Sequence, residues 1–253
     1  MKIIVDDLLV NYQDDGKGKI VLMLHGWGTN LHTFDTLAEH LQNKFRVVRL
    51  DFPGFGGSDK PRTAWSVEDY SHFTRQFLEK LDIEDFYTVI THSFGGRIVI
   101  KGVATSEIKP EKIILMGSAG VKPTMTIKKA FYKTVAKSGR IVTSLPGLSK
   151  LRPALKRRLY KSANATDYLE TSSVMRQVFL NVINEDLKQY AADINCPTLL
   201  MWGELDDSTP LKDGKILHDL IKDSKLKVIP AAGHFVYEDA PDAVYKEIDE
   251  FIA

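Results

Sequence analysis

The distribution of apolar residues along this chain predicts a series of short buried strands. Five of them are rich in β-branched and other apolar residues and read "FRVVRLD", "FYTVITH", "KIILMGS", "TLLMWG" and "LKVIP". Two short strands, near "KIIVDDLLVNY" and "KIVLMLH", are expected ahead of them. The pattern as a whole indicates about six buried strands after this opening pair.

Segments with helical spacing separate these strands. Helices are expected in "LHTFDTLAEHLQ" and in "SVEDYSHFTRQFLEKL", which begins with a capping serine and repeats Phe73, Phe77 and Leu81 at intervals of four. Three more are expected from about Phe94, through "LKDGKILHDLI" and in "DAVYKEIDEFI". This alternation predicts an α/β fold in which helices cover both faces of a parallel sheet.

Residues 122–185 interrupt the alternation. The segment is helical in character and has no buried-strand pattern, so we expect a body formed by residues 1–121 and 186–253 with a helical unit inserted between them. The insertion holds thirteen Lys and Arg residues but only three acidic ones. It therefore carries a charge of +10 and the body −9, although the net charge of the chain is +1.

The overall composition narrows the class of protein. With 43% hydrophobic and 26% charged residues, the 253-residue chain is typical of a globular protein with a sizeable core. Lys plus Arg number 34 and Asp plus Glu 33, so the net charge gives no support to a nucleic-acid partner. The single cysteine, Cys196, excludes an internal disulfide. The chain has no spacing typical of metal ligands, and we expect neither a metal nor a cofactor.

The opening residues argue against export. Asp6 and Asp7 break the first apolar run, which is unlike a signal peptide. No apolar run approaches the roughly 20 residues that a membrane-spanning helix needs. We therefore expect a cytoplasmic protein without a transmembrane segment.

A candidate nucleophile, Ser93, follows one of the predicted strands in the stretch "THSFGG". The stretch is close to the G-x-S-x-G nucleophile elbow, where small residues are needed two positions to either side of the serine because strand and helix backbones approach there. Gly95 meets this requirement, whereas Thr91 stands in place of the first glycine. Thr91 is still a small residue, so two interpretations remain open: a nucleophile on a strained turn, or a serine that caps a buried helix.

Two further loops supply the other groups that acyl transfer by serine requires. In "MWGELDDSTP", Asp206 and Asp207 compete for the role of the carboxylate that orients the base, and both could instead cap the next helix. His234, in "IPAAGHFVYEDAP", is the candidate base, although a lone loop histidine is often a solvated surface residue. The order Ser, Asp, His, with each residue after a predicted strand, favours a catalytic triad.

Two glycine-containing loops have different expected roles. In "LMLHGWGTN", the backbone N–H of Trp27 is expected to bind an oxyanion together with that of Phe94. We expect His25 to hold this loop rather than to act as a base, and we also place it among the substrate-pocket residues. The stretch "DFPGFGGSDKP" lacks the lysine of a phosphate-binding loop and does not lead into a helix, so we expect a structural loop.

Together these motifs resemble those of the α/β-hydrolase superfamily. "HGWG", "DFPGFGGSD", "HSFGG", "PTLLMWGELD" and "AGHF" occur in that family's order and spacing, over nearly the whole chain outside residues 122–185. The resemblance implies an eight-stranded, mostly parallel sheet flanked by helices, with residues 122–185 as a helical cap inserted after the sixth strand. Family members with a serine at this position differ from the dehalogenases and epoxide hydrolases of the fold, which use aspartate.

The resemblance also implies the roles of individual residues. It assigns Ser93 as nucleophile, Asp206 as acid and His234 as base, with oxyanion donors at Trp27 and Phe94. Some members place the acid after the sixth strand, where this chain reads "MGSAG" without a carboxylate. Lipases of the superfamily sometimes carry a residue other than glycine at the position of Thr91, so this departure does not exclude the elbow.

The function that this constellation favours is hydrolysis of a carboxylic ester through an acyl-enzyme. The alternatives on the same triad are hydrolysis of a C–C bond in vinylogous diketones and cofactor-free perhydrolysis. A third alternative is a ligand sensor that retains the triad and signals through a partner.

The cap is expected to supply most of the pocket for a small-molecule ester. Apolar cap residues that we assign to this pocket are Phe131, Tyr168, Met175 and Phe179. The basic stretches "KKAFYKTVAKSGR" and "LRPALKRRLYK" form either a solvated surface or a face that attracts an anionic substrate or an acidic carrier protein. "HGWGTN" and "DFPGFG" resemble esterases that demethylate pimeloyl groups on acyl carrier protein, which such a face would suit.

Overall fold

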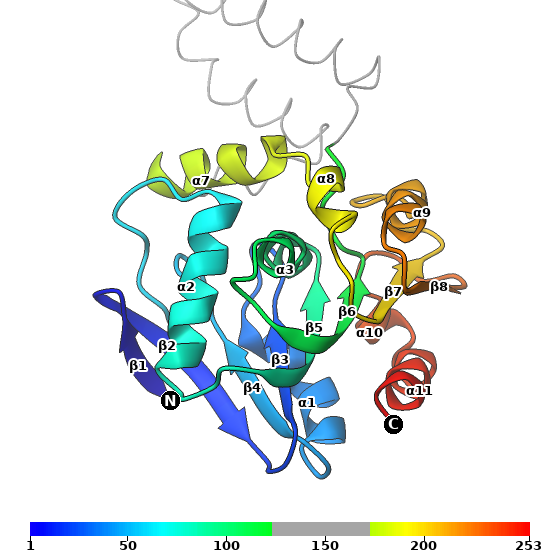
Figure 1. Cartoon of the computed structure of the whole chain (residues 1–253), viewed down its shortest axis with the longest axis horizontal. Helices are drawn as coiled ribbons and strands as arrows, with labels where there is room; N and C mark the ends of the chain where they lie inside the picture. The colour runs from blue at the N-terminus through cyan, green and yellow to red at the C-terminus, as the bar shows by residue number, and fades with distance from the viewer. Residues whose placement is uncertain (123–172) are drawn as a thin grey trace, which may run out of the picture.

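The computed structural model of the protein describes residues 1–122 and 173–253. Within them, eight strands form a sheet in the order β1-β2-β4-β3-β5-β6-β7-β8 (Figure 1). The β1–β2 and β2–β4 pairs are antiparallel and the other pairs are parallel. The strands are β1 (Lys2–Val5), β2 (Leu8–Asp15), β3 (Ile20–Leu24), β4 (Arg46–Leu50), β5 (Phe86–His92), β6 (Pro110–Met116), β7 (Thr198–Gly203) and β8 (Ser224–Ile229). The predicted α/β fold class, with a mostly parallel eight-stranded sheet, is confirmed.

The opening of the chain differs from the prediction. The stretch expected to be one strand is a hairpin, in which Asp6 and Asp7 join β1 to β2 with φ values of 47° and 59°. Two successive residues with positive φ are typical of a type I′ turn, and aspartate adopts this conformation more readily than most residues. The first 24 residues therefore hold three strands rather than two. Five strands, not six, follow in the described part of the chain.

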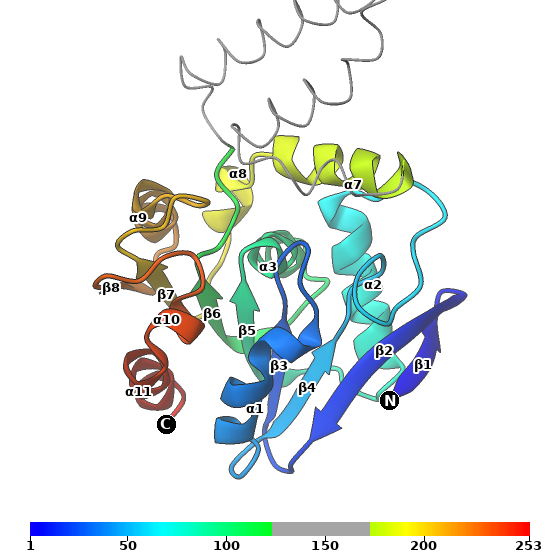
Figure 2. The same ribbon diagram turned by 180° about the vertical axis from the view of Figure 1, so that it is seen from behind.

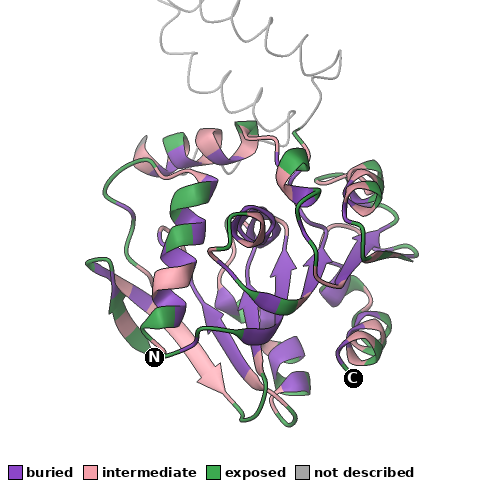
Figure 3. Ribbon diagram, viewed as in Figure 1, coloured by how far each residue is buried: buried purple, intermediate pink, exposed green. Residues whose placement is uncertain are grey.

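Helices cover both faces of the sheet (Figures 1 and 2). One buried cluster joins the sheet to α1 (Asp35–Leu41), α10 (Val236–Asp239) and α11 (Pro241–Ile252), with the short helix η1 (Leu31–Phe34) before α1. The other joins it to α2 (Val67–Glu79), α3 (Phe94–Ala104), α8 (Lys188–Ala191) and α9 (Leu211–Leu220). Side chains of β6 alternate between the two clusters, as expected for a strand buried on both faces. Figure 3 shows the central strands as buried.

The start of α2 confirms the predicted capping serine. The Ser66 hydroxyl accepts the N–H of Asp69, and the Asp69 carboxylate accepts the N–H of Ser66. This reciprocal pair is a capping box, and such a cap contributes about 1 kcal/mol to helix stability. Phe73 and Phe77, on the predicted apolar face of the helix, are buried.

The helix α7 (Ser173–Asn184) lies above the carboxyl ends of the parallel strands (Figures 1 and 2). Its Met175, Val178 and Val182 are buried in the same cluster as α2 and α3, so this helix packs on the body. The cap of residues 122–185 stays a prediction, because residues 123–172 lie outside the described part of the chain.

Candidate active site

Ser93 lies at a sharp turn between a strand and a helix. β5 ends at the residue before it and α3 begins at the residue after it. Its φ of 49° and ψ of −105° are strained for a residue other than glycine. The Ser93 N–H donates to the carbonyl of Met116 at 3.1 Å, and the Ser93 carbonyl accepts the N–H of Ala119 at 3.0 Å. The end of β6 and the loop after it therefore hold this conformation in place.

The residues around the turn are small because several segments converge there. A side chain at Gly95 would collide with the last carbonyl of β3, and one at Gly96 would collide with the hydroxyl of Ser118. Thr91, the departure from the usual elbow, is fully buried and its Oγ1 donates to the carbonyl of Ile114 at 3.3 Å. The sheet thus accommodates the threonine and satisfies its hydroxyl.

The predicted acid and base are in direct contact. His234 Nδ1 lies 2.9 Å from Asp206 Oδ2, and the side chain of Asp206 is fully buried. Asp206 Oδ1 accepts the N–H groups of Ser208 and Thr209, each at 2.9 Å. An ionised carboxylate only accepts hydrogen bonds, so Nδ1 carries a proton, and in the neutral form of the imidazole the lone pair is on Nε2.

Two opposing effects act on the Asp206 carboxyl. Burial raises its pKa, but the hydrogen bond and charge of His234 and the donors of Thr209 lower it by more. The net effect is a lowered pKa, so Asp206 is ionised at neutral pH. The competing Asp207 is exposed, and its carboxylate accepts the Ser208 hydroxyl at 3.4 Å. The contact with His234 thus belongs to Asp206.

Thr209 belongs to this contact, although the sequence analysis did not single it out. Its Oγ1 lies 2.9 Å from Asp206 Oδ2, 2.9 Å from the carbonyl oxygen of Gly117 and 3.2 Å from His234 Nδ1. A hydroxyl can donate to one of these acceptors while its lone pairs accept from His234. The only sequence signal is a threonine three residues after the acid, which is equally typical of a helix cap.

The two predicted oxyanion donors lie on adjacent segments. Trp27 is in the loop after β3, and its ring contacts that of Phe94 with a centroid distance of 5.4 Å. As the first residue of α3, Phe94 has an N–H without an acceptor inside the helix. A Cβ at Gly26 would lie 3.5 Å from the Cβ of Ser93, so the Trp27 loop passes beside the serine.

His25 holds the Trp27 loop from inside the protein. Its Nδ1–H donates to the carbonyl of Gly26 at 2.7 Å, and its Nε2 accepts the N–H of Phe52 at 3.0 Å. Burial lowers the pKa of His25 to about 4, which keeps the ring neutral. The ring is fully buried with both nitrogens bonded, so His25 acts through the loop that it holds rather than as an exposed wall of a pocket.

The other predicted pocket residues divide into two groups. Phe131 and Tyr168 lie outside the described residues. Phe179, on α7, contacts the ring of Trp27 at a centroid distance of 5.1 Å. Met175, on the same helix, is buried against Gly54. The described part of the predicted pocket therefore brings Phe179 close to the candidate oxyanion donor, while Met175 packs in the core.

The glycine-rich stretch after β4 forms a loop whose backbone packs around the carboxylate of Asp51. Asp51 Oδ1 accepts the N–H of Leu31 at 2.7 Å, and its Oδ2 accepts the N–H of Gly57 and an amide N–H of Asn11, both at 2.8 Å. Gly56, with φ 52°, lies directly against this carboxylate, where a side chain would not fit. An anionic centre of this kind suits the predicted structural role and would repel a phosphate.

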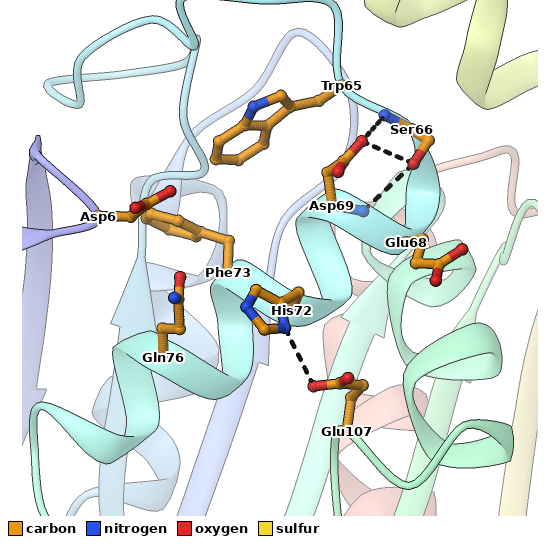
Figure 4. A pocket seen from close by; sticks show the side chains of 9 residues that line it. All are labelled: Asp6, Trp65, Ser66, Glu68, Asp69, His72, Phe73, Gln76 and Glu107. Carbon is orange, nitrogen blue, oxygen red and sulfur yellow. Dashed lines mark hydrogen bonds and ion pairs between the residues drawn. The ribbon is translucent and has the colours of Figure 1, made fainter.

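A hollow of about 320 Å³ opens on the outer face of α2 (Figure 4). It is lined by Asp6, Trp65, Ser66, Glu68, Asp69, His72, Phe73, Gln76 and Glu107. Several of its polar groups serve local structure, since Ser66 and Asp69 cap α2 and His72 lies 3.5 Å from Glu107. None of these residues belongs to the predicted triad, so the hollow is separate from the candidate active site.

Residues 1–122 and 173–253 contain no helix with the length and apolar character needed to cross a membrane. They also contain no group of three or more His, Cys, Asp or Glu side chains placed to hold a metal ion.

Similarity to known proteins defines the class of this protein. Residues 19–241 match the family model described as alpha/beta hydrolase fold, so the chain belongs to the α/β-hydrolase family. The predicted family is confirmed.

Named relatives within this class carry out different reactions. The 2-hydroxy-6-oxononadienedioate/2-hydroxy-6-oxononatrienedioate hydrolase 1 of Pseudomonas putida is 26% identical over 268 residues, covering 97% of this chain and 92% of its own. The pimeloyl-[acyl-carrier protein] methyl ester esterase of Aliivibrio fischeri (strain MJ11) is 23% identical over 257 residues, covering 95% and 96%. The structure of an esterase from Exiguobacterium antarcticum has a TM-score of 0.76 at 22% identity, covering 99% of this chain and 98% of its own. At this identity the structural likeness shows the fold alone.

Proposed function

We propose that the protein is a serine hydrolase that cleaves a carboxylic ester through an acyl-enzyme on Ser93. The observation that carries this proposal is the hydrogen bond between the buried Asp206 carboxylate and His234, together with a serine held at positive φ directly after His92, whose ring contacts that of His234. A buried carboxylate that fixes the histidine tautomer leaves Nε2 as the basic atom. A strained serine at the start of a helix supplies the nucleophile.

The reaction would proceed in two halves. Ser93 Oγ attacks the carbonyl carbon of the ester and passes its proton to His234 Nε2, while Asp206 stabilises the imidazolium. The N–H groups of Trp27 and Phe94 donate to the oxyanion. When the tetrahedral intermediate collapses, the C–O bond to the alcohol breaks and the alkoxide takes the proton from Nε2. Water then attacks the acyl-enzyme by the same route and releases the acid and free Ser93.

The charge of the chain supports an anionic acyl donor. Residues 122–185 carry +10 in sequence, and the esterase of A. fischeri acts, by its name, on an ester carried by acyl carrier protein. An acidic carrier would be attracted by such a charge, and salt would weaken this attraction. We therefore expect kcat/KM for a carrier-bound ester to exceed that for the free ester and to fall as salt is added. Equal, salt-independent values would exclude the carrier.

Hydrolysis of a C–C bond is the second candidate. It is favoured by the P. putida relative, which is by its name a hydrolase of 2-hydroxy-6-oxononadienedioate and 2-hydroxy-6-oxononatrienedioate. The identity of this relative with the chain is comparable to that of the esterase. A kcat/KM for such a dienedioate at least tenfold above that for the best simple ester would make C–C bond hydrolysis the proposed function in place of ester hydrolysis.

The test is hydrolysis of p-nitrophenyl esters from acetate to decanoate by the wild type and by Ser93→Ala. We expect turnover of about 1–10³ s⁻¹ for some chain length. Ser93→Ala should lower it by at least about 10⁴-fold. Ser66→Ala is the matched control, because Ser66 caps α2 outside the site and its loss should lower stability but leave turnover unchanged. Activity retained by Ser93→Ala would exclude the acyl-enzyme on this residue.

A further inference from the structure

His92, the residue before Ser93, is a buried histidine that has no part in the proposed reaction steps. Its side chain is 1% exposed. Its ring lies against the rings of His234, Phe235 and Tyr237, with centroid distances of 4.6, 4.8 and 5.2 Å. The imidazole therefore fills the space between the nucleophile turn and the loop that carries the candidate base.

One nitrogen of this ring bonds to the backbone of the base itself. His92 Nε2 lies 3.1 Å from the carbonyl oxygen of His234. A carbonyl oxygen only accepts, so Nε2 carries the proton and Nδ1 keeps a lone pair. His92 Nδ1 is buried without a hydrogen-bond partner in the described part of the chain. An unsatisfied buried nitrogen is costly, so a simple filler at this position would be an apolar residue.

The charge state of His92 is set by its surroundings. Burial lowers its pKa to about 3, helped by the neighbouring His234 and His25 and opposed by the bond to the His234 carbonyl and by Asp206. The ring is therefore neutral at neutral pH. A neutral ring donates from one nitrogen only, and this donor is used on His234.

The opposite side of the ring faces the candidate oxyanion loop. A Cβ at Gly26 would lie 2.7 Å from His92 Nδ1, a distance that real Cβ atoms do not adopt. The absence of a side chain at Gly26 lets the imidazole fit between the oxyanion loop and the base loop. The ring thus touches both loops, and its own backbone leads into the nucleophile turn.

Hydrogen bonds hold the residues on either side of His234: the Gly233 N–H donates to Asp239 Oδ2 at 2.7 Å, and the Phe235 carbonyl accepts the N–H of Asp239 at 2.9 Å. Ala231 has a φ of 57°, and the helix α10 begins only after Phe235. Asp206 holds the tip of the His234 ring at Nδ1. Among the described residues, His92 provides the hydrogen bond to the His234 carbonyl. This bond at the His234 carbonyl adds to the contacts of Asp206 and Thr209 with the ring, so the residue is held at both its ring and its backbone.

We propose that His92 is a positioning residue whose Nε2–H holds the His234 carbonyl and so fixes the orientation of the His234 imidazole for its reaction with Ser93. This inference rests on the proposed function, because it assigns His234 as the base. It predicts that the hydrogen-bond donor, rather than the bulk of the ring, is what the reaction needs. Loss of the donor should slow the chemical steps, which depend on the base, and leave substrate binding nearly unchanged.

The experiment compares His92→Gln, which places an amide donor at a similar reach, with His92→Met, which has similar length and no donor. The readouts are kcat and KM for the best p-nitrophenyl ester and the rate at which a fluorophosphonate labels Ser93. We expect His92→Met to lower kcat and the labelling rate by about 10- to 100-fold, as a misplacement of about 1 Å does, with KM changed less than threefold. His92→Gln should restore both rates to within about threefold of the wild type.

A second pair keeps the test decisive if His92→Met does not fold. His92→Asn has the same amide as His92→Gln but is one methylene shorter, so it should lose the rates that glutamine preserves. Equal rates in the wild type, His92→Met and His92→Asn would overturn the inference, as would equal losses in glutamine and asparagine. A wild type in which Ser93 is not labelled would instead overturn the proposed function, and the inference with it.

Discussion

Replacing Asp206 by asparagine separates the charge of this side chain from its shape. The asparagine can still accept the N–H groups of Ser208 and Thr209 through Oδ1, so the loop after β7 should keep its conformation. At the other oxygen, however, an amide NH₂ takes the place of the acceptor of His234 Nδ1–H. Two donors would then face each other across 2.9 Å.

The size of the effect follows from the tautomer of His234. The conflict is relieved when the imidazole places its proton on Nε2 and turns the Nδ1 lone pair toward the new amide. In that tautomer Nε2 has no lone pair to take the proton of Ser93. In triads of this type, the wrong tautomer lowers kcat about 10⁴-fold, which corresponds to about 5.4 kcal/mol in the barrier. The loss of one charged hydrogen bond should lower the free energy of unfolding by only about 1.5–3 kcal/mol.

The assay is kcat/KM for the best p-nitrophenyl ester, with urea unfolding of each variant measured alongside. Asp207→Asn is the matched control, because Asp207 is one residue away, exposed and not bonded to His234. Its activity should stay within about twofold of the wild type, since an isolated exposed carboxylate contributes little. The reasoning is refuted if Asp206→Asn stays within tenfold of the wild type, or if Asp207→Asn loses more activity than Asp206→Asn.

Four further changes have expected outcomes. Thr209→Val removes the hydroxyl that contacts Asp206 Oδ2, His234 Nδ1 and the carbonyl of Gly117. We expect kcat to fall about tenfold with KM unchanged. An unchanged kcat would exclude a role of Thr209 in holding the acid. Gly26→Ala should displace the His92 ring and lower kcat for the same ester at least about tenfold. Wild-type kinetics would mean that the ring can move without any loss of activity. Thr91→Gly removes a buried hydroxyl that donates to a carbonyl of the sheet, so the free energy of unfolding measured in urea should fall by about 1–2 kcal/mol. We expect kcat to stay within about threefold of the wild type. A much larger loss of kcat would mean that the threonine itself takes part in the reaction. His25 and His92 have pKa values lowered to about 4 and about 3 from their usual value near 6.5, so the unfolded chain binds protons that the native protein does not. Their contribution to stability is complete well above pH 6.5 and is lost as the pH falls, by about 2 kcal/mol between pH 6 and 5 for the pair. Urea unfolding across this range should show this loss, and His92→Gln should halve its slope.

Much of the fold could be predicted because burial leaves a periodic trace in the sequence. Because helices cover both faces of the sheet, β5 is buried along its whole length and β6 over its last four residues, and both therefore contain mainly apolar stretches. Ser66 with Asp69 marks the start of α2 by a local rule. The hairpin at Asp6 and Asp7 was missed because its turn depends on backbone angles that aspartate adopts only in context.

The candidate site was predictable only as far as its residues follow strands. Ser93, Asp206 and His234 stand where parallel strands end, so their approximate position followed from the topology. Adjacent carboxylates such as Asp206 and Asp207 cannot be told apart by pattern, because the turn decides which one is buried. The bond from His92 to His234 joins residues 142 positions apart, and no local signal marks it.

The most direct test of the central claim is to trap the acyl group on the protein. The wild type would be mixed with a p-nitrophenyl ester in excess, quenched in acid within milliseconds and digested, and the mass of each peptide would be measured. Ser93→Ala, treated in the same way, identifies any label that is not catalytic. We predict a single acyl adduct on the peptide that contains Ser93, formed with a burst of p-nitrophenol and absent from Ser93→Ala. Turnover without this adduct, or an adduct on another residue such as Cys196, would contradict the account.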